Sequence, residues 1–169
     1  MTPTDLQQVK AFAQQDGLLL CLLWTASFLF IVFIPTSTIG MLLMLCTPLL
    51  MYWRLGQFRD NALEGHISFF RALLYCIQLF GAAAILFALV QLVYFQWLDH
   101  GRFFSLINNS IEQIKPLYEQ QNISIDQLQA AVSTLKDISA IQLVGSFLFQ
   151  NLFIGIVLSL IIALTGKRK

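Results

Sequence analysis

The chain has 169 residues, of which 57% are hydrophobic and 11% are charged, and its formal net charge is +1. A mean hydropathy of +0.73 lies outside the range of soluble globular domains, so this class is excluded. A charge so close to zero, without an extended basic patch, also excludes nucleic-acid binding. The composition therefore predicts a membrane protein whose first partner is the lipid bilayer.

Four apolar runs are long enough to cross ~30 Å of hydrocarbon as helices. The first, residues 17–34, is uncharged and continues a polar leading segment that is predicted to be helical. Because this leading segment is slightly acidic, we expect the first run to be a retained anchor rather than a cleaved signal. The second run, residues 38–53, is short, and Pro48 predicts a kink in it. The third and fourth runs cover residues 72–98 and 141–165.

The longest segment between spans is predicted to form two amphipathic helices. Apolar residues recur at helical spacing from residue 102 onward, and Pro116 is predicted to kink or break this first helix. After a polar turn, Ser124 and Gln127 match a helix-capping pair that opens the second apolar stripe. The fold class is therefore all-α: one integral membrane four-helix bundle, with a two-helix hairpin over about residues 102–139 between the third and fourth spans.

The distribution of lysine and arginine predicts the orientation. With four spans, both termini share one side with the 54–71 connection, and residues 99–140 lie on the other side. Seven cations fall on the first side: Lys10, Arg54, Arg59, Arg71, Lys167, Arg168 and Lys169. Three fall on the other: Arg102, Lys115 and Lys136. The positive-inside rule then places both termini in the cytoplasm and residues 99–140 in the periplasm of a bacterial inner membrane.

Cationic and aromatic residues at the span ends are predicted to anchor the bundle at the membrane interface. These anchors are Arg54, Arg59, Arg71, Lys167, Arg168, Lys169, Trp53 and Trp97.

Polar residues within the spans are the natural candidates for a functional site, because burying them in lipid is costly. The candidate cluster is Gln78, Gln91, Gln142, Gln150 and Asn151. We expect these amides mainly to hold helices together, with Gln91 near Gln142 or Gln150 and Gln78 near Ser159. Lining a path for a neutral solute is the alternative. No charged residue falls in the predicted spans.

Small residues on the last two spans predict close helix packing, either within the bundle or between copies of the chain. They are Gly81, Ala84 and Ala88 on the third span and Gly155, Ser159 and Ala163 on the fourth.

The sequence carries no common catalytic, metal-binding or cofactor-binding motif, so we expect no cofactor and no catalytic residue. Asp60, Glu64 and His66 form a weak candidate cluster, because one histidine with two carboxylates beside the flexible Gly65 is a poor ligand pattern. The three cysteines fall within predicted spans and are expected to be free thiols.

Four motifs, in order, resemble bacterial membrane proteins grouped as domain of unknown function 4199. They are GQFRDNALEGHISFFRALLYC, WLDHGRF, QQNISIDQ and IGIVLSLIIALTGKRK. The resemblance covers nearly the whole chain and implies a four-span inner-membrane protein without an assigned activity. The sequence departs from the family pattern at Glu64, where a small residue is expected, and at His100, where proline is common.

The function predicted from these features is a non-enzymatic scaffold, accessory subunit or homo-oligomer, which could bind another membrane protein through residues 102–139. The first alternative is a small oligomeric channel or transporter for a neutral solute, and a membrane enzyme comes last.

Overall fold

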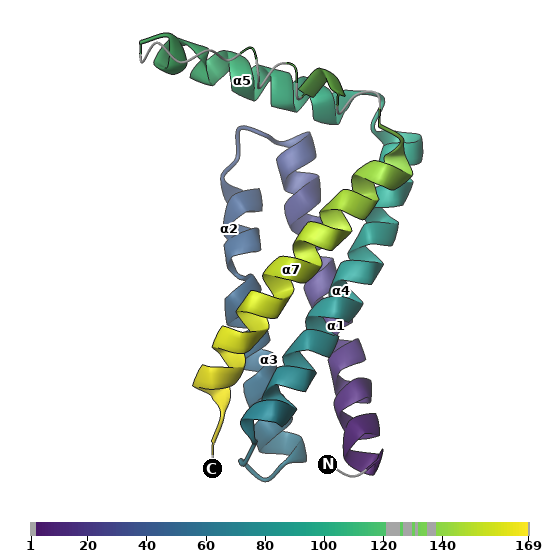
Figure 1. Cartoon of the computed structure of the whole chain (residues 1–169), viewed down its shortest axis with the longest axis vertical. Helices are drawn as coiled ribbons and strands as arrows, with labels where there is room; N and C mark the ends of the chain where they lie inside the picture. Colours follow the sequence, from purple (N-terminus) through teal and green to yellow (C-terminus); the bar gives the residue numbers. More distant parts are fainter. Residues whose placement is uncertain (1–2, 121–125, 127–129, 131, 135–137, 169) are drawn as a thin grey trace.

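The chain folds into long helices, seen in a computed structural model that describes residues 3–120, 126, 130, 132–134 and 138–168. The elements are α1 (Pro3–Phe33), α2 (Ile39–Leu45), α3 (Thr47–Ala62), α4 (Phe69–Val93), the π-helical turn η1 (Tyr94–Leu98), α5 (Arg102–Gln120) and α7 (Ala140–Gly166). Both termini lie at one end of the molecule, and α5 lies across the opposite end (Figure 1). We call these the terminal end and the arm end.

Four helical segments are long and apolar enough to cross a membrane: Asp5–Phe33, Ile39–Ala62, Phe69–Leu98 and Ala140–Gly166. These helical segments overlap the four apolar runs predicted from the sequence, at residues 17–34, 38–53, 72–98 and 141–165. The leading segment is helical, as predicted, and joins the first apolar run in one helix, α1, of 31 residues. The second span extends beyond its predicted end, because α3 continues to Ala62.

The second span is divided at Cys46, between α2 and α3. Pro48 lies in the first turn of α3, where its missing N–H removes no helical hydrogen bond, so the predicted interruption is present. The hydroxyl of Thr47 accepts a hydrogen bond from Nε1 of Trp24 at 2.9 Å. Thr47 therefore ties the start of α3 to α1.

Helix α4 is the central element and packs against both α1 and α7 (Figure 1). The approach to α1 is close at Gly17, where an added Cβ would lie 2.8 Å from the carbonyl oxygen of Leu79. On the other side, Gly155 of α7 lies directly against the ring of Phe80. Glycine at these two positions lets α4 touch both neighbours.

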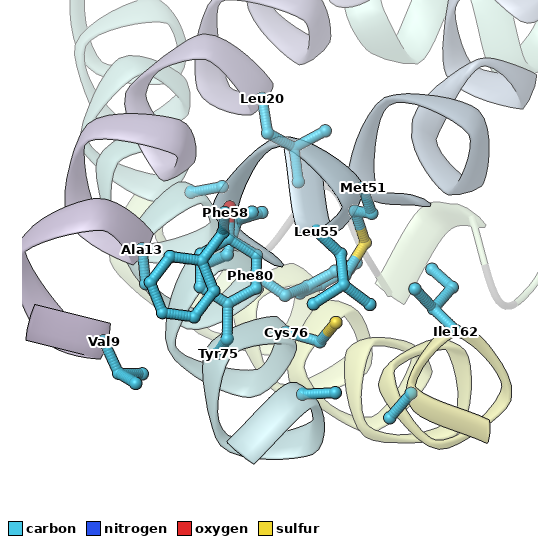
Figure 2. Close-up of a cluster of buried hydrophobic side chains, with 14 of the residues drawn as sticks. Val9, Ala13, Leu20, Met51, Leu55, Phe58, Tyr75, Cys76, Phe80 and Ile162 are labelled. Carbon is cyan, nitrogen blue, oxygen red and sulfur yellow. The ribbon is translucent and has the colours of Figure 1, made fainter. Parts of the chain in front are cut away.

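The main hydrophobic core lies between α1, α3, α4 and α7. Figure 2 shows Leu20 from α1, Leu55 from α3 and Ile162 from α7 around the side chains of α4. Tyr75 and Phe80, both from α4, are almost fully buried in this core. Side chains from all four spans therefore fill the centre of the bundle.

The small residues of α7 and α4 are mostly buried, with one exception. Ser159 and Ala163 are 0% exposed, and Ala84 is 1% exposed. Gly81 differs, because no atom lies within 4 Å of the place where its Cβ would stand. Among the described residues, no helix therefore packs closely at Gly81, so the within-bundle alternative is wrong for this residue, and packing between copies stays a prediction.

The connection between α3 and α4 is a tight turn. Glu64 and Gly65 have φ angles of +53° and +85°, and Ser68 caps α4 by accepting a hydrogen bond from the N–H of Arg71. The helix is interrupted at Gly65, the glycine expected to be flexible. The backbones of Ile67 and Arg168 exchange two hydrogen bonds of 2.9 and 3.2 Å, which fastens this turn to the C-terminal segment.

Helix α5 starts from a second turn with left-handed backbone, at His100 (φ +43°) and Gly101 (φ +80°). The carboxylate of Asp99 accepts hydrogen bonds from the N–H groups of Gly101 (3.1 Å) and Phe103 (2.9 Å), so it caps α5. The ring of Phe103 then packs on Phe95 with centroids 5.2 Å apart. These contacts fix the base of α5 to the end of the third span.

Helix α5 runs through Pro116 to Gln120, so the predicted break at this proline is wrong. Ile111 and Val132 form a small buried cluster with three partly buried neighbours: Phe104, Ile107 and Tyr118. Most of the predicted second hairpin helix, including Ser124 and Gln127, lies outside the described residues.

Candidate functional site

A buried charged cluster joins three of the four spans near the terminal end. Nε of Arg54 on α3 donates to Oδ1 of Asp16 on α1 at 2.7 Å, and Nη2 of Arg54 also contacts this oxygen. The hydroxyl of Tyr75 on α4 donates to the other oxygen of Asp16. Each carboxylate oxygen therefore has a donor from a different helix. We call Asp16, Arg54 and Tyr75 the inner clamp.

The two charged side chains of the inner clamp differ in their exposure to water. The side chain of Asp16 is 1% exposed, whereas that of Arg54 is 19% exposed. Phe58 stacks on Tyr75 with ring centroids 4.7 Å apart and an interplanar angle of 2°, which covers the phenol (Figure 2). A buried carboxylate is costly unless it is paired and hydrogen-bonded, and here it is both.

The sequence patterns do not indicate this cluster. Asp16 precedes the predicted first span by one residue, and Arg54 follows the predicted second span by one residue, so neither is expected inside the bundle. Because α1 and α3 extend past these limits, the two side chains lie inside the protein. The sequence does contain a signal for such an ion pair: an acidic residue at the start of one span and a basic residue at the end of the next span.

Three of the four arginines predicted as membrane anchors bind protein groups. Arg54 belongs to the inner clamp. Arg59 donates to both oxygens of Asp60, at 2.7 and 3.0 Å, and to the carbonyl of Gly166. Arg71 pairs with Asp5 at 3.3 Å and with Gln8 at 2.9 Å. These guanidinium groups therefore hold helix ends together.

Four of the other predicted anchors are exposed, and their contact with the membrane interface stays a prediction. Trp53 is 55% exposed, and Trp97 is 66% exposed at the opposite end of the bundle. Lys167 and Arg168 are also exposed. Lys169 lies outside the described residues.

A groove of about 330 Å³ lies between α7 and α1, toward the arm end. It is lined by three of the predicted polar residues: Gln91 from α4, and Gln150 and Asn151 from α7. Trp24 and Phe28 of α1 form much of its apolar wall. We call this the amide groove.

Two members of the predicted polar cluster do not line the amide groove. The side chain of Gln142 is exposed and caps α7 together with Ser139, so its predicted contact with Gln91 is wrong. Gln78 lies elsewhere on α4. Within the described residues, the Oε1 of Gln78 accepts no hydrogen bond and the Oγ of Ser159 has no hydrogen-bond partner. These two atoms therefore do not bind each other, and the predicted proximity of Gln78 to Ser159 stays a prediction.

The turn between α3 and α4 shows no metal centre. Nδ1 of His66 lies 3.0 Å from the carbonyl oxygen of Glu64. Among the described residues, no three histidine, cysteine or acidic side chains are close enough to hold a metal ion. Cys21, Cys46 and Cys76 are free thiols.

The long apolar helices and the polar groups between them define a multi-span helical membrane protein. The chain belongs to the family described as "Protein of unknown function (DUF4199)", which matches residues 15–168. This agrees with the resemblance seen in its motifs. Searches of curated proteins and of solved structures returned no match.

Proposed function

We propose that the protein is a non-enzymatic accessory subunit of the bacterial inner membrane, and that α5 forms the docking surface for its partner. In this proposal both termini are cytoplasmic and residues 99–140 are periplasmic, in keeping with the seven-to-three distribution of cations. The inner clamp serves to hold three spans together, because its charges satisfy one another.

The observation that carries the proposal is that α5 is fixed at its base and open along its polar side. Asp99 and the ring of Phe103 fasten the first turn of α5 to the bundle. Arg102 adds to this attachment, with its guanidinium carbon 4.7 Å from the centroid of the Phe33 ring. Asn109 and Gln113, farther along α5, are exposed. A rigidly based amphipathic helix with an open face is suited to bind another protein.

The packed centre of the bundle argues against transport by a single chain. Leu79, Phe80 and Ala83 of α4 are at most 3% exposed and fill the space between α1 and α7. A solute path through the middle of one chain would have to displace these side chains. A channel would therefore need several copies of the chain.

One observation favours such an oligomer as the second candidate function. Gln150 is exposed on α7, near the middle of the predicted fourth span. An amide facing lipid there is unfavourable, and pairing with a neighbouring copy would satisfy it. Replacing Gln150 by Leu tests what this amide does in such an oligomer: lost assembly indicates helix association, whereas lost flux with retained assembly indicates a solute path.

The test of the docking surface is site-specific photo-crosslinking in native membranes. A photoreactive residue at Asn109 should give a stoichiometric adduct with one foreign protein, identified by mass spectrometry. The matched control is the same residue at Asn61, which is also exposed but lies at the terminal end. Adducts only with the protein itself, or equal adducts at both positions, would contradict the accessory-subunit proposal.

Orientation is tested separately with a membrane-impermeant maleimide on intact spheroplasts. The background carries serine at Cys21, Cys46 and Cys76. A cysteine introduced at Asn109 should react, whereas one at Asn61 should react only after the membrane is opened. The opposite pattern would invert the proposed topology.

A further inference from the structure

The amide groove contains a buried polar atom without a partner. Gln91 is 6% exposed, and its Oε1 has no hydrogen-bond partner in the described part of the chain. Burying a carbonyl oxygen without a donor is unfavourable, and such groups in native proteins call for an explanation. Because Gln91 lines the groove, a molecule occupying the groove could supply the missing donor.

A second helix adds two further amides to the groove. Gln150 and Asn151 belong to α7, whereas Gln91 belongs to α4, so polar groups from two helices line the same groove. All the residues that line it are uncharged. The groove therefore suits a neutral molecule with more than one hydrogen-bonding group, and it offers no counter-charge to a phosphate.

The walls of the groove carry aromatic rings in edge-to-face contact. The rings of Trp24 and Phe87 have centroids 5.7 Å apart at an interplanar angle of 67°. Those of Phe28 and Phe87 are 5.9 Å apart at 83°. A planar ring inserted beside such a cluster can adopt the same offset or edge-to-face contacts, which favours an aromatic guest over a branched one.

The rim of the groove faces the lipid. Met44 of α2 and Ile154 of α7 line the groove and are 52% and 43% exposed. Both lie in helical segments apolar enough to cross a membrane. A ligand can thus enter sideways from the bilayer and leave an apolar tail among the lipid chains.

From these observations, we propose that the amide groove binds a hydroxylated aromatic lipid, namely a hydroquinone or phenol ring with an apolar tail. A ring hydroxyl donates to Oε1 of Gln91, and a second polar group of the ring reaches Gln150 or Asn151. The ring lies against Trp24 and Phe28. A volume of about 330 Å³ is sufficient for one such ring with the start of its tail.

Tryptophan fluorescence can test this in nanodiscs of neutral phospholipid. The chain has three tryptophans, so replacing Trp53 and Trp97 by Phe leaves Trp24, in the groove wall, as the reporter. The probe is a ubiquinol analogue with a decyl tail. We expect saturable quenching with one site per chain, whereas simple partition into lipid would give quenching that rises without saturation.

A matched pair of variants identifies the contact. Gln91→Leu should weaken binding roughly tenfold, because one hydrogen bond to a buried oxygen is lost. Gln78→Leu should leave binding unchanged, because Gln78 is another α4 amide with an unpartnered oxygen but does not line the groove. Quenching that never saturates, or equal affinities for wild type and Gln91→Leu, would overturn the proposal.

A second probe tests the same hydrogen bond on the wild-type protein, so the result does not depend on whether a variant folds. Methylating both ring hydroxyls keeps the shape and tail of the analogue but removes its hydrogen-bond donors. The methylated probe should bind the wild-type protein at least fivefold more weakly. Equal affinity of the two probes would show that no donor meets Gln91, and the proposal would fail.

Discussion

The inner clamp predicts a large and asymmetric response to removing either charge. Replacing Arg54 by Met leaves the carboxylate of Asp16, which is 1% exposed, with only the hydroxyl of Tyr75 as a partner. Replacing Asp16 by Asn leaves Arg54, which is 19% exposed and has a long side chain that can reach water. The first change should therefore be much more harmful than the second.

Typical values for buried ion pairs and hydrogen bonds give the expected losses in the free energy of unfolding. Removing one partner of a buried pair costs about 3–5 kcal/mol, which is the expectation for Arg54→Met. Asp16→Asn retains an acceptor for Tyr75 and should cost about 1–2 kcal/mol. The double variant has no uncompensated buried charge and should also cost about 1–2 kcal/mol. The two sites are therefore coupled by about 3–5 kcal/mol.

The assay is reversible unfolding by sodium dodecyl sulfate in mixed micelles, followed by far-UV circular dichroism, for the wild type, both single variants and the double variant. Tyr75→Phe serves as a reference, because it removes one hydrogen bond to the carboxylate and leaves both charges in place. It should cost about 1.5–3 kcal/mol. Additive effects of the two charge substitutions, or a loss below about 1 kcal/mol for Arg54→Met, would refute the clamp.

Three further predictions concern backbone geometry. Gly17→Ala should destabilise the protein by about 1–3 kcal/mol in the same unfolding assay, because its Cβ meets the α4 backbone, whereas Gly81→Ala should be neutral or stabilise by up to about 1 kcal/mol. Glu64→Gly should stabilise the protein by about 1 kcal/mol, because glycine adopts the positive φ at this position without strain. A loss of stability would show that the contacts of the Glu64 side chain outweigh this strain. Asp99→Ala should cost about 1 kcal/mol and speed amide hydrogen exchange in the first turn of α5, and unchanged exchange would argue against the cap.

Hydropathy predicts the number and position of the spans because the bilayer imposes one strong requirement on length and polarity. It carries no information about how each helix is rotated about its axis. Asp16 and Arg54 therefore appeared to be outside the bundle, although the rotation of α1 and α3 turns them toward each other. The same limit explains why Gly81 seemed to be a packing residue, whereas the close approach to α4 occurs at Gly17.

Three of the five amides in the predicted cluster come together in the structure. Gln91, Gln150 and Asn151 do line one groove. Gln142 does not, because its distance of three residues from Ser139 lets it cap α7 locally. A capping interaction requires no partner helix, so it competes well with a contact across the bundle.

The inner clamp also bears on how the chain enters the membrane. Asp16 and Arg54 are 38 residues apart, and only a short turn separates the spans that carry them. A span with an unpaired charge near its end inserts at a cost, and the second span supplies the opposite charge as soon as it follows the first. The first two spans can therefore enter the bilayer together as a neutral hairpin. Tyr75 then joins this hairpin when α4 arrives, so the order of synthesis matches the order in which the clamp is completed.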